Sequence, residues 1–148
     1  MFTEDSVGID APPHLVWQVF SDVERWPEWT ASVTSLVGLD GAGLAVGRRF
    51  AIKQPGMSKL VWKVTELEPG SSWTWVGRSP GARVTACHDV IAKPGGRTLV
   101  RQQIDLRGLL GSLVGRLMVK KTRRFLELEA QGLKARSERL SRADDSHS

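Results

Sequence analysis

The stretch "DAPPHLVWQVFSDVERWPEW", residues 10–29, decides how the chain is organised, because it separates one N-terminal strand from a long series of strands. Asp10 is a candidate helix cap, and Pro12 and Pro13 suit the first turn of a helix. Apolar residues then follow at helical spacing. Pro27 lacks an N–H and disfavours helix at the residue before it. We therefore predict one helix, followed by a second short helical segment that starts near the proline.

Residues 32–107 change to a period of two, with turn signals at "GLDGAG", "QPGMS", "EPGSS", "SPG" and "KPGG". This pattern is typical of an antiparallel meander with short turns. Residues 2–9 form a first strand with a weaker alternation. The further predicted strands are 33–39, 47–54, 59–68, 72–78, 82–93 and 97–106.

The C-terminal part reads as one long amphipathic helix over about residues 109–140. Thirty residues at about 1.5 Å each are long enough to cross a whole sheet. Residues 1–140 are predicted to form a single domain, and the polar segment 141–148 a disordered tail. The apolar stripe of the helix consists of Leu110, Leu113, Val114, Leu117, Met118, Phe125, Leu128 and Leu133.

Composition excludes several classes of protein. With 41% hydrophobic and 25% charged residues the chain is an ordinary globular sequence rather than a disordered one. The single cysteine excludes an internal disulfide, and the N-terminus lacks a secretory signal, so we expect a cytoplasmic protein. Three scattered histidines suggest no metal site, and no motif implies a cofactor.

The order of elements is strand, two short helices, six strands and a long helix. It predicts an α+β fold in which a curved antiparallel sheet of about seven strands wraps around the C-terminal helix. The helix covers only part of the concave face, so we expect a cavity between helix and sheet. Such cavities bind small molecules.

Three segments carry a resemblance to a known family: "APPHLVWQVFSDVERWPEW", "KLVWKVTELEPGSSWTWVGRSPGARVTACHDV" and "GGRTLVRQQIDLRGLLGSLVGRLM". Over about residues 2–140 the chain resembles the START-related polyketide cyclase/dehydrase superfamily, also called SRPBCC. Its members have the helix-grip fold of the birch-pollen allergen. The resemblance implies a hydrophobic cavity for lipids, polyketides, sterols or isoprenoid compounds. Some members use this cavity for cyclisation or dehydration, and others for transport or sensing.

The strand "ARVTACHDVIA" places His88 on one face with apolar residues. An imidazole there is a candidate for proton transfer or for holding a ligand carbonyl, and the alternative is a core histidine. If the last strand pairs in register, Gln102 supplies a second polar group. On the opposite face, Arg101 and Asp105 suggest a cross-strand ion pair.

Large apolar side chains supply the remaining candidates for a ligand site, each with a place in the core as the alternative. Trp26 and Trp29 form either a lid over the cavity or a wedge between helices and sheet. Glu66 shares the face of Trp62 by alternation, as either a buried acid or a wet strand end. The predicted ligand-binding residues are Trp26, Trp29, Trp62, Trp73, Trp75, Val84, Ala86, Gln102, Ile104, Val114, Met118 and Phe125.

Basic residues gather on one face of the C-terminal helix at Arg116, Lys120, Arg123 and Arg124. This face suits a phosphate-bearing partner, but Glu127 and Glu129 favour ordinary solvated pairing. We expect no nucleic acid and no stable membrane insertion, and either a monomer or a homodimer.

Two functions fit the sequence. The first is a polyketide cyclase/dehydratase-like activity with His88 as the catalytic residue and Gln102 as its partner. The second is a non-catalytic carrier or sensor of a hydrophobic ligand. In both, the partner is a small hydrophobic molecule.

Overall fold

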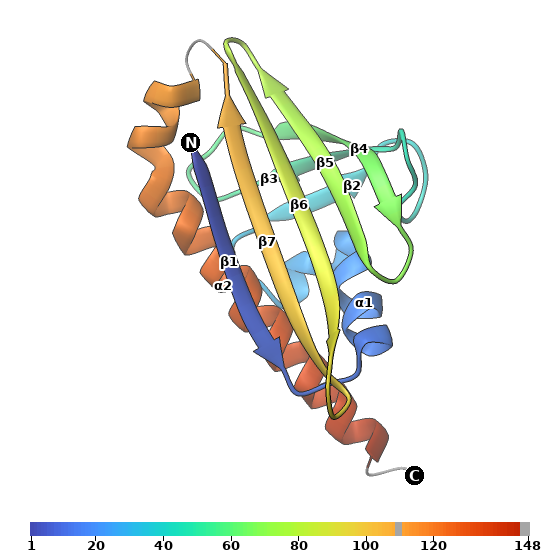
Figure 1. Ribbon diagram of the computed structural model, residues 1–148. Helices are drawn as coiled ribbons and strands as arrows, with labels where there is room; N and C mark the ends of the chain where they lie inside the picture. Colours follow the sequence, from blue (N-terminus) through green and yellow to red (C-terminus); the bar gives the residue numbers. More distant parts are fainter. Residues whose placement is uncertain (109–110, 146–148) are drawn as a thin grey trace.

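The computed structural model describes residues 1–108 and 111–145, without the side chains of 111, 112, 114 and 115. Figure 1 shows a curved sheet with the long helix α2 lying across it and the shorter helices at its lower end. The elements are β1 (Phe2–Ile9), α1 (Pro13–Ser21), the 3-10 helix η1 (Val23–Glu28), β2 (Ser35–Gly38), β3 (Arg49–Lys53), β4 (Leu60–Glu68), β5 (Ser72–Ser79), β6 (Ala82–Lys93), β7 (Arg97–Arg107) and α2 (Gly111–Asp145).

All seven strands form one antiparallel sheet in the order β1-β7-β6-β5-β4-β3-β2. Six consecutive strands pair as a meander, and β1 joins its free edge beside β7. The predicted α+β helix-grip fold is confirmed. α2 continues to Asp145, five residues beyond the predicted end, so residues 141–145 are helical.

The start of α1 differs in detail from its prediction. Pro12 occupies the N-cap and Pro13 the first turn, with no side-chain cap. Asp10 instead uses its backbone N–H to donate a 2.8 Å hydrogen bond to Glu138 of α2. The short helix η1 begins at Val23, so Pro27 lies inside it rather than at its start. A 3-10 helix of six residues has few internal hydrogen bonds, so the missing proline donor costs little there.

The core is densest where α1 and η1 fill the space between sheet and helix. The Trp26 ring stacks on Phe20 with a centroid distance of 5.5 Å, and its indole N–H donates a 2.8 Å bond to the Phe20 carbonyl. Phe20 in turn packs edge-on against Trp73 at 4.8 Å. Three large rings are therefore buried against one another at this place.

The first turns of α2 do not bury the whole predicted stripe. Leu113 and Leu117 are exposed, whereas Phe125 and Leu133 are buried. At about 100° per residue, Leu113 and Leu117 point away from the inward direction that Phe125 and Leu133 define. The prediction that these two leucines pack on the sheet is wrong. Leu110 and the side chain of Val114 lie outside what the structure describes.

Within the described ranges 1–108 and 111–145, we find no helix with the length and hydropathy that a membrane crossing requires.

Candidate functional site

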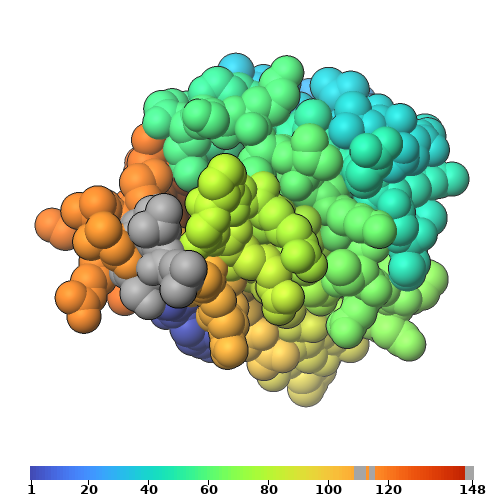
Figure 2. Space-filling model, turned by 90° about the horizontal axis from the view of Figure 1, so that it is seen from above, coloured from blue at the N-terminus to red at the C-terminus, as the bar shows by residue number. Residues whose placement is uncertain are grey.

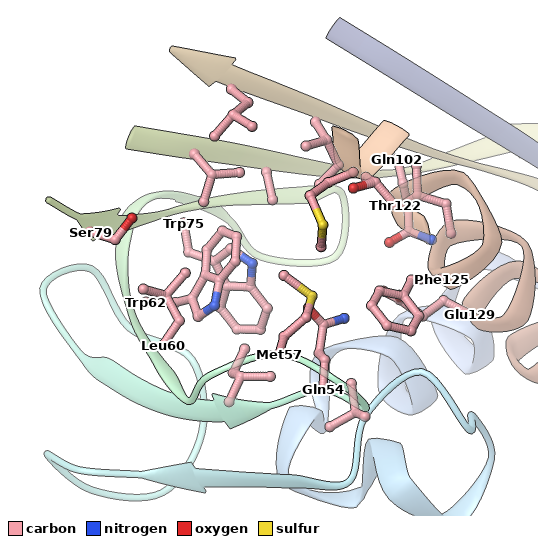
Figure 3. A pocket seen from close by; sticks show the side chains of 18 of the residues that line it. Gln54, Met57, Leu60, Trp62, Trp75, Ser79, Gln102, Thr122, Phe125 and Glu129 are labelled. Atoms are coloured by element: carbon pink, nitrogen blue, oxygen red, sulfur yellow. The ribbon is translucent and has the colours of Figure 1, made fainter. Parts of the chain in front are cut away.

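A cavity of about 490 Å³ lies between α2 and the concave face of the sheet. Its size falls within the range of small-molecule sites. Most of its wall is apolar, and Figure 3 shows side chains from the sheet, the β3–β4 loop and α2 converging on it. The lining residues are Met1, Trp26, Val33, Ile52, Gln54, Gly56, Met57, Ser58, Lys59, Leu60, Trp62, Trp75, Ser79, Ala82, Val84, Ala86, His88, Gln102, Ile104, Leu106, Met118, Thr122, Phe125, Leu126 and Glu129.

Strands β6 and β7 bring two polar side chains to the cavity. Their register pairs His88 directly with Gln102, which is the condition under which the sequence placed a second polar group beside His88. Both side chains face the concave side because they share the alternation of the buried apolar residues, and each residue is only 3% exposed. The two polar groups therefore lie side by side in an otherwise apolar surface.

A β-bulge in β4 decides the position of Glu66. Val64 pairs with Trp75, but Glu66 pairs with Thr74, so Thr65 is an extra residue. An extra residue reverses the alternation of the strand beyond it. Glu66 is consequently exposed, and the prediction that it shares the face of Trp62 is wrong.

The aromatic wall of the cavity is formed by Trp62 and Trp75, whose ring centroids lie 6.0 Å apart. In Figure 3 these rings occupy the opposite side of the cavity from Gln102 and Glu129. The site thus has an aromatic side and a polar side.

His88 is held in one neutral tautomer. Its ring stacks on Trp73 with centroids 4.1 Å apart, and Nδ1 lies 3.2 Å from the Trp73 carbonyl oxygen. A carbonyl only accepts hydrogen bonds, so Nδ1 carries the proton and Nε2 is an acceptor. Desolvation by burial lowers the pKa of His88 to about 3, against the weaker opposing effect of the Trp73 carbonyl.

Glu129 is the polar residue that the sequence analysis misplaced. We predicted a solvated pairing role, but the residue is 6% exposed and lines the cavity. Its spacing from Met118 and Phe125, eleven and four residues, places it on the inward face of α2. The sequence alone shows this spacing, but the basic residues nearby favoured the interpretation of Glu129 as a solvated partner in an ion pair.

Burial keeps Glu129 protonated near neutral pH. Desolvation raises the pKa of this carboxyl group to about 8, and the hydroxyl of Ser32 partly offsets the rise. Ser32 is itself positioned by Thr30, whose hydroxyl donates to Ser32 Oγ at 3.0 Å. The loop after η1 thus orients a carboxylic acid that carries an O–H donor.

Gln102 has no internal partner for its amide group. No other residue in the described part of the chain forms a hydrogen bond with this side chain, although the residue is 97% buried. Buried amides are normally hydrogen-bonded. The group faces the cavity, where a ligand would supply the missing partner.

The predicted site residues divide into three groups. The structure places Trp29 and Trp73 outside the lining, with Trp29 against Trp26 and Trp73 beneath His88. The side chain of Val114 lies outside the described residues. Those that the structure brings together around the cavity are Trp26, Trp62, Trp75, Val84, Ala86, His88, Gln102, Ile104, Met118 and Phe125.

Charged groups on the outer face of the sheet are engaged in ion pairs. Arg101 contacts Asp89 at 3.3 Å and Glu4 at 3.8 Å, and Asp105 pairs with Arg107 rather than with Arg101. Among the described residues, no cluster of His, Cys, Asp or Glu suits a metal ion.

A curved sheet that encloses an apolar cavity against a long C-terminal helix defines the START-like helix-grip class. Residues 3–138 match the sequence family described as polyketide cyclase/dehydrase and lipid transport. The chain therefore belongs to this family. No curated protein sequence matches it.

Solved structures with the same fold are distant in sequence. A hypothetical protein from Helicobacter pylori has a TM-score of 0.80 at 18% identity, over 93% of this chain and 88% of its own. A START superfamily protein from Mycobacterium smegmatis has 0.72 at 18%, over 94% and 98%. The Zhui aromatase/cyclase from Streptomyces sp. R1128 has 0.73 at 17%, over 94% of both chains. At these identities the likeness establishes the fold.

Proposed function

We propose that the protein binds an uncharged apolar molecule in this cavity, of the polyketide, lipid or isoprenoid type, and holds a hydroxyl or carbonyl group at its polar side. The unpaired amide of Gln102 carries this proposal. This amide makes no hydrogen bond to another described residue and is open to the cavity, so a ligand hydroxyl or carbonyl can pair with it.

The polar side offers hydrogen bonds without net charge. Glu129 supplies an O–H donor, His88 Nε2 an acceptor, and the Gln102 amide supplies both. A ligand carboxylate at the polar side would lie beside Glu129. Of the cationic groups of the described lining residues, Lys59 is at the exposed rim, and the Met1 ammonium donates a 2.8 Å hydrogen bond to the Leu106 carbonyl. These groups therefore favour a neutral ligand over an anionic one.

The test compares two probes of equal chain length, 2-dodecanone and dodecanoate, by calorimetry at pH 6.5. We expect the ketone to bind at least about tenfold more tightly, a difference of about 1.4 kcal/mol. Gln102→Met should weaken ketone binding about fivefold, through the loss of one hydrogen bond. Gln103→Met is the matched control, because Gln103 lies on the other face of β7 and is absent from the lining. Failure of both probes to bind would overturn the proposal.

Dehydration of a bound hydroxy ketone is a second candidate function, favoured by the protonated state of Glu129. In the dehydration of a β-hydroxy ketone, an undissociated carboxylic acid can protonate the hydroxyl group as it leaves as water. The carboxylate that results can take up the proton lost from the carbon between the hydroxyl and the carbonyl, so that water and an enone form and the acid is restored. His88 is a weak base at a pKa of about 3, which suits hydrogen bonding to the substrate better than proton abstraction. In a dehydration assay, Glu129→Gln should lose most activity while ketone binding is retained. An unchanged rate would remove Glu129 from the reaction.

A non-catalytic carrier or sensor uses the same contacts without a reaction. Native mass spectrometry of protein purified from its own host separates the two cases. A co-purified compound that is recovered unchanged after incubation supports a carrier, and conversion of the compound supports an enzyme.

A further inference from the structure

The first turns of α2 present two large apolar side chains to solvent. Leu113 is 59% exposed and Leu117 is 76% exposed, whereas Met118 and Phe125 line the cavity. At about 100° per residue, Met118 and Phe125 face about a third of a turn away from the two leucines. Four residues separate them, so they are neighbours one turn apart on the same face. Because both side chains are exposed, they contribute little to the packing of the core.

Cations surround these leucines. Arg116, Lys120 and Arg124 are exposed, and their spacing puts them on the same outward side of α2. Lys121 and Arg123 flank them. Residues 106–126 contain no acidic residue at all, whereas Asp and Glu resume at Glu127.

The strand ends beside this helix segment are also basic. The exposed residues among the cavity lining, which include Gly56, Lys59 and Ser79, come from these ends and from the β3–β4 loop. The cavity therefore opens at this end of the molecule, which Figure 2 views from above, with α2 in orange on one side and the β5–β6 turn in yellow-green near the centre. Further exposed cations at the strand ends are Arg78, Arg83 and Arg107.

We propose that this end of the molecule docks on the surface of a bilayer that contains anionic phospholipids. Leu113 and Leu117 would enter the boundary of the acyl chains, while Arg116, Lys120 and Arg124 contact lipid phosphates. Basic amphipathic helices with exposed leucines bind membrane interfaces in this way. The docking is peripheral, and it requires no spanning helix.

Two other occupants fit the same face less well. Nucleic acid would neutralise the cations but leave both leucines in water. A second copy of the chain would cover the leucines but bring two basic faces together, and like charges repel. An anionic bilayer satisfies both features at once. The docking proposal does not depend on the proposed binding of an apolar ligand. If both proposals are correct, the open end of the cavity faces the bilayer.

The experiment is co-sedimentation with vesicles of phosphatidylcholine alone or with about 30% phosphatidylglycerol. We expect at least about fivefold more bound protein on the anionic vesicles in 50 mM NaCl, and a large decrease at about 300 mM because salt screens exposed charges. Leu113→Ser/Leu117→Ser should lose most of this binding, and Lys120→Glu/Arg124→Glu should abolish the preference for anionic lipid.

Matched controls lie elsewhere on the molecule. Val37→Ser/Val46→Ser changes two other exposed apolar residues, and Lys93→Glu/Arg97→Glu makes the same change in net charge at the opposite end of the sheet. Both should bind anionic vesicles as the unaltered protein does, and circular dichroism checks that every variant folds.

Four results would overturn the docking proposal. The first is no binding to anionic vesicles at low salt, and the second is an equal loss in the control variants. The third is a dimer, detected by light scattering, that Leu113→Ser/Leu117→Ser dissociates. Duplex DNA bound more tightly than vesicles would likewise contradict it. Ketone binding in solution needs no vesicles, so failure of docking is distinguishable from failure of the ligand site.

Discussion

The two ends of the space between α2 and the sheet differ in how they are filled. At the closed end, α1 and η1 insert Phe20 and Trp26 between helix and sheet, and Leu133 of α2 is fully buried. At the open end, next to Met118, no other described element lies between helix and sheet, and the cavity occupies that space. One helix thus contributes to a close-packed core over one part of its length and to a binding site over another.

The largest expected difference between the ends comes from removing a tryptophan. Trp26→Ala should lower the free energy of unfolding by about 4 kcal/mol, because it leaves a void among Phe20 and Trp73 and removes a buried hydrogen bond. The rings of Trp26 and Trp62 both border the cavity, but Trp62 is less buried and its indole N–H donates to no other described residue. Trp62→Ala, at the open end, should therefore cost about half as much. Chemical denaturation at pH 6 measures both. Equal losses would mean that the two ends are packed alike.

Close approach of α2 to η1 gives the second test. Gly132 lies against the backbone carbonyl of Trp29, and a Cβ there would overlap the oxygen. Gly132→Ala should therefore destabilise the protein by about 3 kcal/mol, near the upper end for overpacking, although alanine favours helix. Gln131→Ala, at the exposed neighbouring position, should change stability by less than about 0.5 kcal/mol. A Gly132→Ala variant that is more stable than the unaltered protein would show that α2 can move away from the Trp29 carbonyl at little cost in free energy.

The polar side of the cavity predicts how stability depends on pH. Glu129 keeps its proton in the folded protein up to about pH 8 but loses it near 4.5 when unfolded, so its contribution to stability declines as pH rises between these values. His88 is neutral when folded down to about pH 3 but protonates near 6.5 when unfolded, so its contribution declines as pH falls through that window. The two effects cancel between about pH 4.5 and 6.5.

Stability should consequently be greatest between about pH 4.5 and 6.5 and fall by about 2 kcal/mol from pH 6.5 to 8. Glu129→Gln should abolish the alkaline decline and keep the acid one, and His88→Phe should do the reverse. Denaturation at a series of pH values measures these slopes. An alkaline decline that persists in Glu129→Gln would contradict a buried, protonated carboxyl group.

The smallest expected effect is at the rim of the cavity. Met118→Ala should change the free energy of unfolding by less than about 1 kcal/mol, because the half-exposed side chain borders space that is already open. It should instead weaken ketone binding, which calorimetry measures. A loss as large as that of Leu133→Ala, which should be about 3 kcal/mol, would show that the open end is part of the packed core.

The errors of the sequence analysis have two physical origins. The alternation rule failed at Glu66 because one bulge in β4 reversed the faces of the strand. The charge pattern of α2 misled at Glu129, since a local (i, i+4) rule does not report which side of a helix meets the sheet. Leu113 and Leu117 belong to the apolar stripe but are turned away from the inward direction of Phe125 and Leu133. In β4 the regular pattern itself was interrupted, and in α2 the pattern did not report which side of the helix meets the sheet.

The sequence by itself determined the order of elements, the strand boundaries to within about two residues, the family, and the position of His88 on an apolar strand face. These features follow from turn residues and from hydrophobic periodicity, which are local patterns that can be read directly from the sequence. Only the tertiary structure decided that Glu129 is a protonated acid inside the cavity, that the amide of Gln102 has no partner, and that two leucines of α2 are exposed. Burial and pKa depend on what lies across the fold, and segments distant in sequence set those contacts.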